Sequence, residues 1–325
     1  MQKIGRRRSS TRLARAAALG VIADLVFGEP PLAWHPVALF GRLMAHVERS
    51  IYRDSRRRGA LYAAVGVATG AGAGVALTST VLATYLAVGG RMLCDTAEAV
   101  AAALSRNDLE AARQLLPALV GRDPNELDAS EMARAVVESI AENTVDAIVA
   151  PVLWATIGGA PLVLAHRALN TMDACVGYPN ARYTRFGWAS ARLDDLANFL
   201  PARLTALFVA IVRPKAAGAI WRAVRDDAPA HPSPNAGVAE AAAAAGLGLR
   251  LGGRNSYGGR TEVRPVLGRG RPPEAGDIAG AVRLCRHVTL ALVAVLLAAE
   301  PIAVLAGRLA SAHRPTRRRA ATRWS

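Results

Sequence analysis

Residues 60–90 form a run rich in Gly, Ala, Val and Leu without a single charged side chain, and this run constrains the fold more than any other feature. It exceeds the roughly 20 apolar residues that a helix needs to cross a bilayer. We therefore predict a membrane span here and a second one over the apolar stretch at 287–307. Four glycines in the first run have the spacing of a close helix-packing face: Gly66, Gly70, Gly72 and Gly74.

Composition agrees with a single, mainly α, polytopic membrane domain over residues 1–325. The chain is 52% hydrophobic and 20% charged, more apolar than an average soluble domain. Its net charge of +15 comes largely from arginine clusters beside apolar segments, at Arg6–Arg8, Arg56–Arg58 and Arg317–Arg319. Such clusters are typical of segments that face anionic lipid, and no aromatic and basic pattern of a nucleic-acid module occurs. We expect a multi-pass protein of the cell membrane whose partner is the lipid bilayer, not nucleic acid.

The remaining segments are shorter. Residues 16–28 predict a re-entrant or short helix, and 145–169 and 199–213 are possible further spans, the first broken at Pro151 and at the GGAP turn. Residues 226–277 are rich in Pro, Gly and Arg and predict an extramembrane loop with a short Ala-rich helix at 238–247, and 310–325 predict a basic tail.

Three carboxylates fall at helical spacing where the chain becomes apolar. Glu138, Glu142 and Asp146 stand at i, i+4 and i+8, so a helix places them on one face, where like charges repel. Carboxylates in apolar, membrane-embedded sequence are costly and usually functional. We interpret Glu142 and Asp146 as Mg²⁺ ligands, since Mg²⁺ prefers carboxylate oxygens. The alternative is a solvated helix face paired with Arg134 or Arg167.

A second polar group follows on the next helical segments. Carboxylates and amides beside arginines suit a Mg²⁺–phosphate site, with metal on carboxylates and phosphate oxygens on guanidinium forks. The alternative is a set of structural salt bridges at helix ends. The members are Asn170, Asp173, Asp194, Asp195 and Asn198, with Arg182, Arg185 and Arg192.

Two loops carry further candidates. His35 precedes a proline, and His231-Pro-Ser-Pro-Asn235 is a rigid polar loop that can contact a ligand, although a lone histidine is usually structural. The three cysteines are far apart and predict neither a zinc site nor a disulfide framework. No phosphate-binding P-loop, nucleophile elbow or HExxH motif occurs.

At this point three segments resemble the adenosylcobinamide-phosphate synthases of cobalamin biosynthesis, which are integral membrane enzymes. The resemblance runs in order over roughly residues 20 to 300, and its central motif is highly specific. Glu29 stands where the family pattern has Asp, and Ala147 where a glycine often follows Asp146. The matching segments are ADLVFGEPPLAWHPVALFGRL, ESIAENTVDAIVAPVLWATIGGAPLVLAHRALNTMDACVGYPNARYTRFGWASARLDDLANFLPARLTAL and DAPAHPSPNAGVAEAAAAAGLGLRLGG.

The resemblance implies an acid–amine ligase. It would join (R)-1-amino-2-propanol, or its O-phosphate, to a corrin side-chain carboxylate of adenosylcobyric acid, giving adenosylcobinamide or its phosphate. A carboxylate is a poor electrophile, so activation by ATP with Mg²⁺ fits such a ligase. One alternative is a membrane component that binds or transports corrinoids, with the polar groups lining a passage. Another, suggested only by the NTMD sequence, is a Mg²⁺-dependent membrane prenyltransferase.

From the chemistry of the side chains we predict one converging site, although its carboxylates lie up to 53 positions apart (195 − 142). The predicted catalytic residues are Glu142, Asp146, Asp173, Asp194 and Asp195. The predicted Mg²⁺ ligands are Glu142, Asp146, Asp194 and Asp195. The predicted substrate-binding residues are His35, Asn143, Asn170, Arg182, Arg185, Arg192, Asn198, His231, Ser233 and Asn235.

Overall fold

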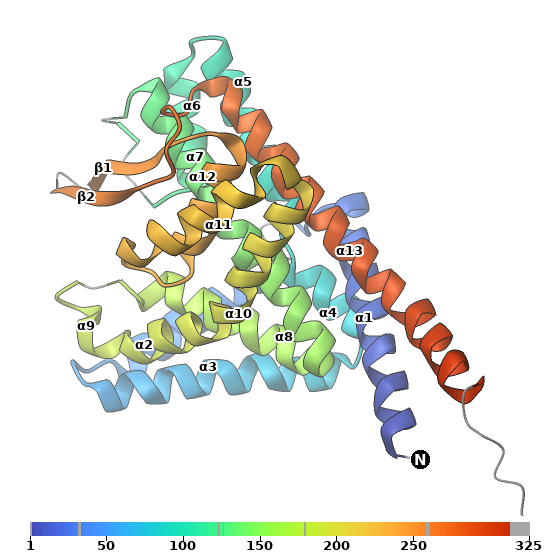
Figure 1. Cartoon of the computed structure of the whole chain (residues 1–325). Helices are drawn as coiled ribbons and strands as arrows, with labels where there is room; N and C mark the ends of the chain where they lie inside the picture. The colour runs from blue at the N-terminus through green and yellow to red at the C-terminus, as the bar shows by residue number, and fades with distance from the viewer. Residues whose placement is uncertain are drawn as a thin grey trace, which may run out of the picture.

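The computed structural model is almost entirely helical (Figure 1). The predicted tail at 310–325 falls largely outside the described residues, as do Arg317–Arg319 and the side chains of Arg6–Arg8. The structure describes residues 2–31, 34–121, 124–125, 127–178, 180–257 and 260–312, without the side chains of 2–10, 254–262 and 300–312.

The described helices and strands follow one another without internal repetition. The N-terminal half holds α1 (Gln2–Phe27), α2 (Pro36–Ile51), α3 (Arg56–Leu77), α4 (Thr80–Ala87), α5 (Gly90–Ser105), α6 (Leu109–Leu115) and α7 (Ala129–Thr144). After a short π-helical segment at Val145–Val149 come α8 (Ala150–Val176), α9 (Tyr183–Phe186), α10 (Trp188–Val212), α11 (Ala217–Asp226), α12 (Ala236–Leu247), β1 (Leu251–Tyr257), β2 (Arg260–Leu267) and α13 (Ala275–Ala312).

Four described helical stretches are long and apolar enough to cross a membrane: Arg56–Leu77, Ala129–Val176, Trp188–Val212 and Ala275–Ala299. On α10 the large side chains of Leu196 and Ile211 are 72% and 55% exposed, the pattern expected of a surface that contacts lipid. The prediction of a mainly α, polytopic membrane protein is confirmed.

The boundaries of the spans differ from the sequence-based ones. The 60–90 run is not one helix, because α3 ends at Leu77 and Thr78 takes a left-handed conformation with φ of 57°. Ser79 then caps α4 by accepting a hydrogen bond from the Leu82 amide at 3.2 Å. At the other end of the chain, 287–307 lies inside α13, whose candidate span begins at Ala275. Of the predicted short helix at 16–28, residues 16–27 form the second half of the longer helix α1, which ends at Phe27.

The glycines of α3 pack against α8. A methyl group added to Gly70 would lie 2.6 Å from the Leu164 carbonyl oxygen, and one added to Gly66 or Gly74 would collide with Met172 or Ala160. The prediction of a glycine packing face is therefore confirmed for three of the four positions. Gly72 is different, since a methyl group there would meet no atom within 4 Å.

The helical stretch from α7 to α8 is interrupted twice. The π-helical segment contains Asp146, and such segments often occur at functional sites. The second interruption is a kink at Gly158 and Gly159, where Gly159 has φ of 65°. Residues 145–169 thus break at the predicted GGAP turn, and Pro151, in the first turn of α8, directly follows the π-helical segment. The Ala147 carbonyl, four residues before Pro151, accepts from the Gly89 N–H at 3.0 Å.

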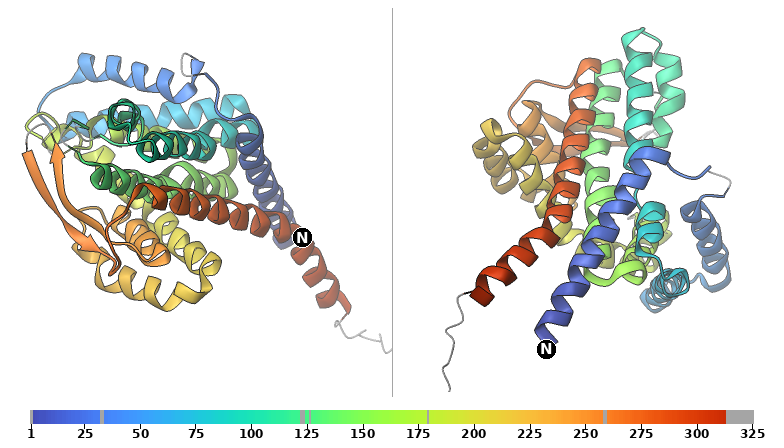
Figure 2. Two further views of the ribbon diagram at one scale, coloured as in Figure 1. Left: turned by 90° about the horizontal axis from the view of Figure 1, so that it is seen from above. Right: turned by 90° about the vertical axis from the view of Figure 1, so that its right-hand side faces the viewer.

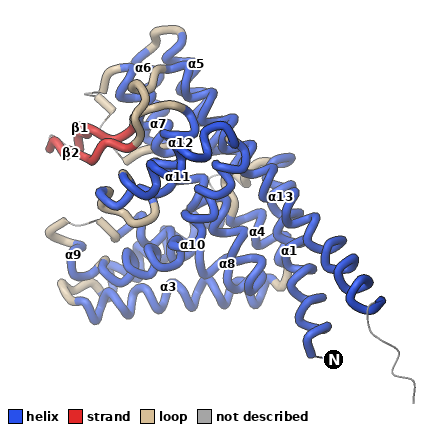
Figure 3. The backbone as a smooth tube through the Cα atoms, in the orientation of Figure 1, coloured by secondary structure: helices blue, strands red, loops and turns tan. Residues whose placement is uncertain are grey.

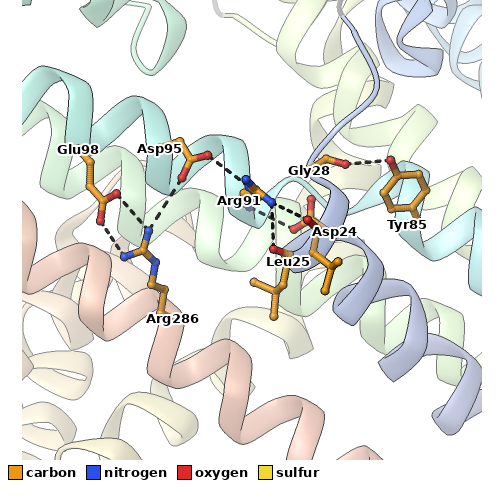
Figure 4. Close-up of polar contacts among 9 residues, drawn as sticks. Asp24, Leu25, Gly28, Tyr85, Arg91, Asp95, Glu98 and Arg286 are labelled. Carbon is orange, nitrogen blue, oxygen red and sulfur yellow. Dashed lines mark hydrogen bonds and ion pairs between the residues drawn. The ribbon is translucent and has the colours of Figure 1, made fainter.

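The ends of α1, α5 and α13 are joined by polar contacts (Figure 4). The backbone N–H of Arg91 donates to Asp24 at 3.1 Å, and the Arg91 guanidinium donates to the Val26 carbonyl at 2.7 Å. Arg286 of α13 pairs with Glu98 of α5 at 2.7 Å. These contacts join both α1 and α13 to α5, and α1 and α13 also lie side by side, as both views of Figure 2 show.

The segment 226–277 contains α12, which agrees with the short helix expected at 238–247, and an antiparallel hairpin that was not expected (Figure 3). The hairpin is attached to α7 through Gly252. The Gly252 N–H donates to Glu138 Oε1 at 2.8 Å, and the Gly252 carbonyl accepts from Arg134. Glu138 therefore has a structural contact in addition to its place on the acidic face of the helix.

Candidate functional site

Two adjoining cavities meet at the π-helical segment and the C-terminal end of α8. The first is bordered by α7 and the second by the N-terminal half of α10. Their volumes are about 410 Å³ and about 300 Å³. Both are lined by Glu142, Asp146, Asp173 and Gly177, so they form one continuous polar space.

The five predicted catalytic carboxylates converge on this space. Glu142, Asp146 and Asp173 line both cavities, while Asp194 and Asp195 line the second. The folding of α10 back along α8 brings the two distant acidic segments together. The predicted convergence is therefore present in the structure, and the catalytic roles of these residues stay predictions.

Asp146 is oriented by an asparagine. Asn170 Nδ2 donates to Asp146 Oδ2 at 3.0 Å, and Asn170 Oδ1 accepts from Arg167 Nη1 at 3.2 Å. Arg167 also interacts electrostatically with Asp194 and Glu29. The sequence-based alternative pairs the acidic helix face with Arg134 or Arg167. In the structure the side-chain amide of Asn170 links Asp146 to Arg167.

Asp194 has a parallel arrangement on the neighbouring helix. Asn198 Nδ2 donates to Asp194 Oδ2 at 2.9 Å, and Asn198 Oδ1 lies 2.9 Å from His166 Nε2. All three side chains are buried. Asp194 lines the second cavity, and its Oδ1 is buried with no hydrogen-bond partner among the described residues.

The His231–Asn235 loop closes one side of the second cavity with Ser233 and Asn235. Asn235 Nδ2 donates to the Asp195 carbonyl at 2.7 Å, and Asn235 Oδ1 accepts from Arg203 at 3.0 Å. His231 lies behind this wall, 3.8 Å from the buried Glu240. The loop fixes α10 against α12, and of its predicted binding residues Ser233 and Asn235 reach the cavity.

The three predicted phosphate-binding arginines, Arg182, Arg185 and Arg192, do not line the cavities. Arg182 binds Glu48 at 2.9 Å, and Arg185 lies 3.6 Å from Asp54, both at the protein surface. Arg192 is exposed and interacts electrostatically with Asp195. Arg182, which precedes α9, and Arg185 of α9 thus contact acidic residues of α2 and of the α2–α3 connection, and their predicted binding of substrate phosphate stays a prediction.

His35 is also outside the cavity lining. Its Nδ1 accepts from the Val37 amide at 3.2 Å, and its Nε2 lies 2.8 Å from Glu29 Oε2. His35 is the N-cap of α2, and this local role explains its position before a proline.

The remaining lining residues combine predicted and missed positions. Asn143 lines the first cavity and donates to the Ser139 carbonyl at 3.0 Å. Glu240 of α12 and Arg264 of β2 line it too, although neither was among the predicted site residues. Only the tertiary packing of α12 and the hairpin brings these two charged groups to the carboxylates.

Among the described residues, no group of three or more His, Cys, Asp or Glu side chains is arranged to hold a metal ion. Mg²⁺ in proteins is commonly bound by one or two carboxylates together with water and substrate phosphates. The carboxylates of the cavities suit that mode, in which the substrate completes the coordination. They do not form the four-carboxylate cluster expected from Glu142, Asp146, Asp194 and Asp195.

The family model and the similar proteins found by comparison point to the same family. The family model described as CobD/Cbib protein matches residues 17–285. "Cobalamin biosynthesis protein CobD" of Mycobacterium tuberculosis (strain ATCC 25618 / H37Rv) is 46% identical over 89% of this chain and 97% of its own length. The protein of the same name from Geobacter metallireducens is 42% identical over 91% and 98%, and that from Rhodobacter capsulatus 39% identical over 86% and 98%. No solved structure matches. The chain therefore belongs to the CobD/CbiB family of cobalamin biosynthesis proteins.

Proposed function

We propose that the protein forms an amide between a corrin side-chain carboxylate of adenosylcobyric acid and the amine of (R)-1-amino-2-propanol or its O-phosphate, in the cell membrane. The observation that carries the proposal is the convergence of five carboxylates on one polar space, in a chain of a cobalamin biosynthesis family.

The carboxylates suit the amine substrate. At neutral pH an alkylamine is an ammonium ion, which a group of carboxylates attracts. It must lose a proton before its nitrogen can attack a carbonyl carbon, and a carboxylate at hydrogen-bond distance can accept that proton. Asp194 is the best placed, because Asn198 fixes one of its oxygens and the other has no protein partner among the described residues.

ATP is the proposed source of activation. Transfer of its terminal phosphoryl group to the corrin carboxylate would give an acyl phosphate, and attack by the neutral amine would then form the amide and release phosphate. Mg²⁺ bound with the nucleotide would offset the phosphate charge beside the carboxylates. Within this chain, Asp146 and Asp173 at the junction of the two cavities are the residues suited to hold it, and Arg264 is the arginine that lines the space.

The shape of the site favours an enzyme over a corrinoid transporter. A corrin ring is larger than either cavity, so only its reacting side chain would enter while the ring stays at the opening. The polar side chains gather at one place between α7, α8 and α10, where a transport passage would need them along a whole span.

The test is a reconstituted reaction. Purified protein in detergent is incubated with adenosylcobyric acid, ATP, Mg²⁺ and either aminopropanol or aminopropanol phosphate, and the corrinoid product is followed by mass spectrometry. The proposal predicts a product with the added mass of the amine minus water, dependent on ATP. Binding of the corrinoid without any mass change would support the transport alternative.

A further inference from the structure

A third cavity of about 290 Å³ lies on the other side of α12 from the carboxylate site, between α11, α12 and the turn that follows β2. It shares no lining residue with the two carboxylate cavities. The amide-forming reaction proposed above makes no use of it.

The cavity is open because its walls carry small side chains. Ala219 and Ala223 of α11 face Ala244 and Ala245 of α12 across it, and glycines supply the third wall. Larger side chains at these positions would fill the hollow, which opens to the surface at Arg222, Gly248 and Arg269.

The third wall is a turn held from two sides. The Gly268 N–H donates to Asp227 Oδ2 at 3.0 Å, and the Gly270 N–H donates to the Leu249 carbonyl at 3.3 Å. Gly268 has φ of 81°, and a methyl group there would lie 2.6 Å from the Leu249 carbonyl oxygen, so the turn requires glycine. Arg269 at its centre therefore has a fixed backbone position.

Two guanidinium groups line the cavity from segments far apart in the chain, Arg222 on α11 and Arg269 on the turn. Neither has a hydrogen bond or a close ion pair among the described residues. The neighbouring carboxylates are already engaged, Asp227 by the Gly268 amide and Asp226 by Arg225 at 2.7 Å. Arg225 in particular, with Arg269 and Arg222 at longer range, lowers the pKa of Asp226.

We propose that this cavity is a second binding site that takes a phosphate group, held by Arg222 and Arg269. A guanidinium presents paired N–H donors that match phosphate oxygens. The lining carries two positive charges, from Arg222 and Arg269, and one negative charge, from Asp227, so its net charge is positive. The small, uncharged walls leave room for the group that carries the phosphate. The phosphate can belong to a soluble small molecule or to a lipid headgroup, since α11 follows directly on the apolar helix α10.

Two probes distinguish these sources. The full chain in phosphatidylcholine nanodiscs is titrated with inorganic pyrophosphate by calorimetry. In parallel, protein extracted from bilayers containing phosphatidylglycerol is examined by native mass spectrometry for retained lipid. Saturable pyrophosphate binding identifies a soluble ligand, and retained phosphatidylglycerol without pyrophosphate binding identifies a headgroup.

The variants decide whether this cavity is responsible. The double variant R222Q/R269Q should weaken binding of the positive probe by roughly tenfold or more, equivalent to about 1.4 kcal/mol. Ala219→Leu, which fills the cavity without changing charge, should weaken it as well. Arg250→Gln removes one exposed arginine outside the lining and should leave binding unchanged.

Two outcomes overturn the proposal. Either neither probe binds the wild-type protein, or R222Q/R269Q and A219L both bind the probe like wild type and unfold at the wild-type temperature. Amide formation is not part of the readout, so the two proposals fail independently.

Discussion

Asn198 holds Asp194 with its amide nitrogen at 2.9 Å and lies 2.9 Å from His166 through its amide oxygen. An asparagine that donates to a carboxylate offers its oxygen only as an acceptor, so His166 carries its proton on Nε2. Asn170 repeats this arrangement between Arg167 and Asp146. Two asparagines thus orient two carboxylates of the candidate site.

Removing the Asn198 amide should destabilise the protein. Asn198→Ala leaves buried polar atoms of both Asp194 and His166 without partners, and the free energy of unfolding should fall by about 1–3 kcal/mol. Chemical unfolding in detergent measures this change. Ser190→Ala on the same helix is the matched control, because the buried Ser190 hydroxyl has no hydrogen-bond partner among the described residues. Equal losses in the two variants would show that the Asn198 bridge adds no stability.

The α3–α8 interface predicts a position-dependent effect of one methyl group. Gly74→Ala forces atoms into contact with Ala160 and should cost about 1–3 kcal/mol of stability. Gly72→Ala, half a turn away, meets open space and should be neutral or slightly stabilising, since alanine favours the helix. Thermal unfolding of the two variants in the same detergent makes the comparison. Similar melting temperatures would contradict the packing seen here.

Asp24 predicts a pH dependence of stability. Burial raises the pKa of this carboxyl to about 6 from an ordinary value of 3.8, and Asp24 lies outside the four candidate spans. Its folded form holds the proton more tightly than the unfolded chain does, so its contribution is complete below about pH 4 and is lost as pH rises through about 6. The unfolding midpoint of wild type should therefore fall between about pH 4 and pH 6 relative to that of Asp24→Asn, which cannot ionise, and the difference should stay constant above that range. Parallel pH profiles of the two proteins would show that Asp24 does not titrate in this range.

The arginines at and away from the cavity should differ in their effect on substrate. Arg264→Gln should raise the KM for aminopropanol phosphate or ATP by about tenfold, because a charge-assisted hydrogen bond to phosphate contributes about 1.5–3 kcal/mol. Arg182→Gln should leave the KM for aminopropanol phosphate and the KM for ATP near their wild-type values, since Arg182 binds Glu48 at the surface. Steady-state kinetics of both variants measures these KM values. A larger increase in KM for the Arg182 variant than for the Arg264 variant would support the sequence-based prediction that Arg182 binds phosphate.

The sequence predicted the helical membrane fold and the acidic residues of the site, because long apolar runs and carboxylates within them are both local patterns. It placed α3 and α4 in one span, since the left-handed turn at Thr78 has no strong sequence signal. It could not find Glu240 and Arg264, which reach the first cavity only through the packing of α12 and the hairpin. It did not show that Arg182 and Arg185 contact Glu48 and Asp54, because proximity in sequence to Asp194 does not fix the direction of side chains at and before α9.

The central claim is that the carboxylate space between α7, α8 and α10 is where the amide forms. The most direct measurement is the single-turnover rate of corrinoid amide formation in wild type, Asp146→Asn, Asp194→Asn and Asp95→Asn. Asp95 is the control, since it is an exposed carboxylate beside Arg91 and Arg286, outside the cavities (Figure 4). Loss of a positioned proton acceptor or cation-binding carboxylate should slow Asp194→Asn and Asp146→Asn by roughly 10²–10⁴-fold, with Asp95→Asn close to wild type. Wild-type rates in both cavity variants would contradict the account and place the reaction elsewhere in the protein.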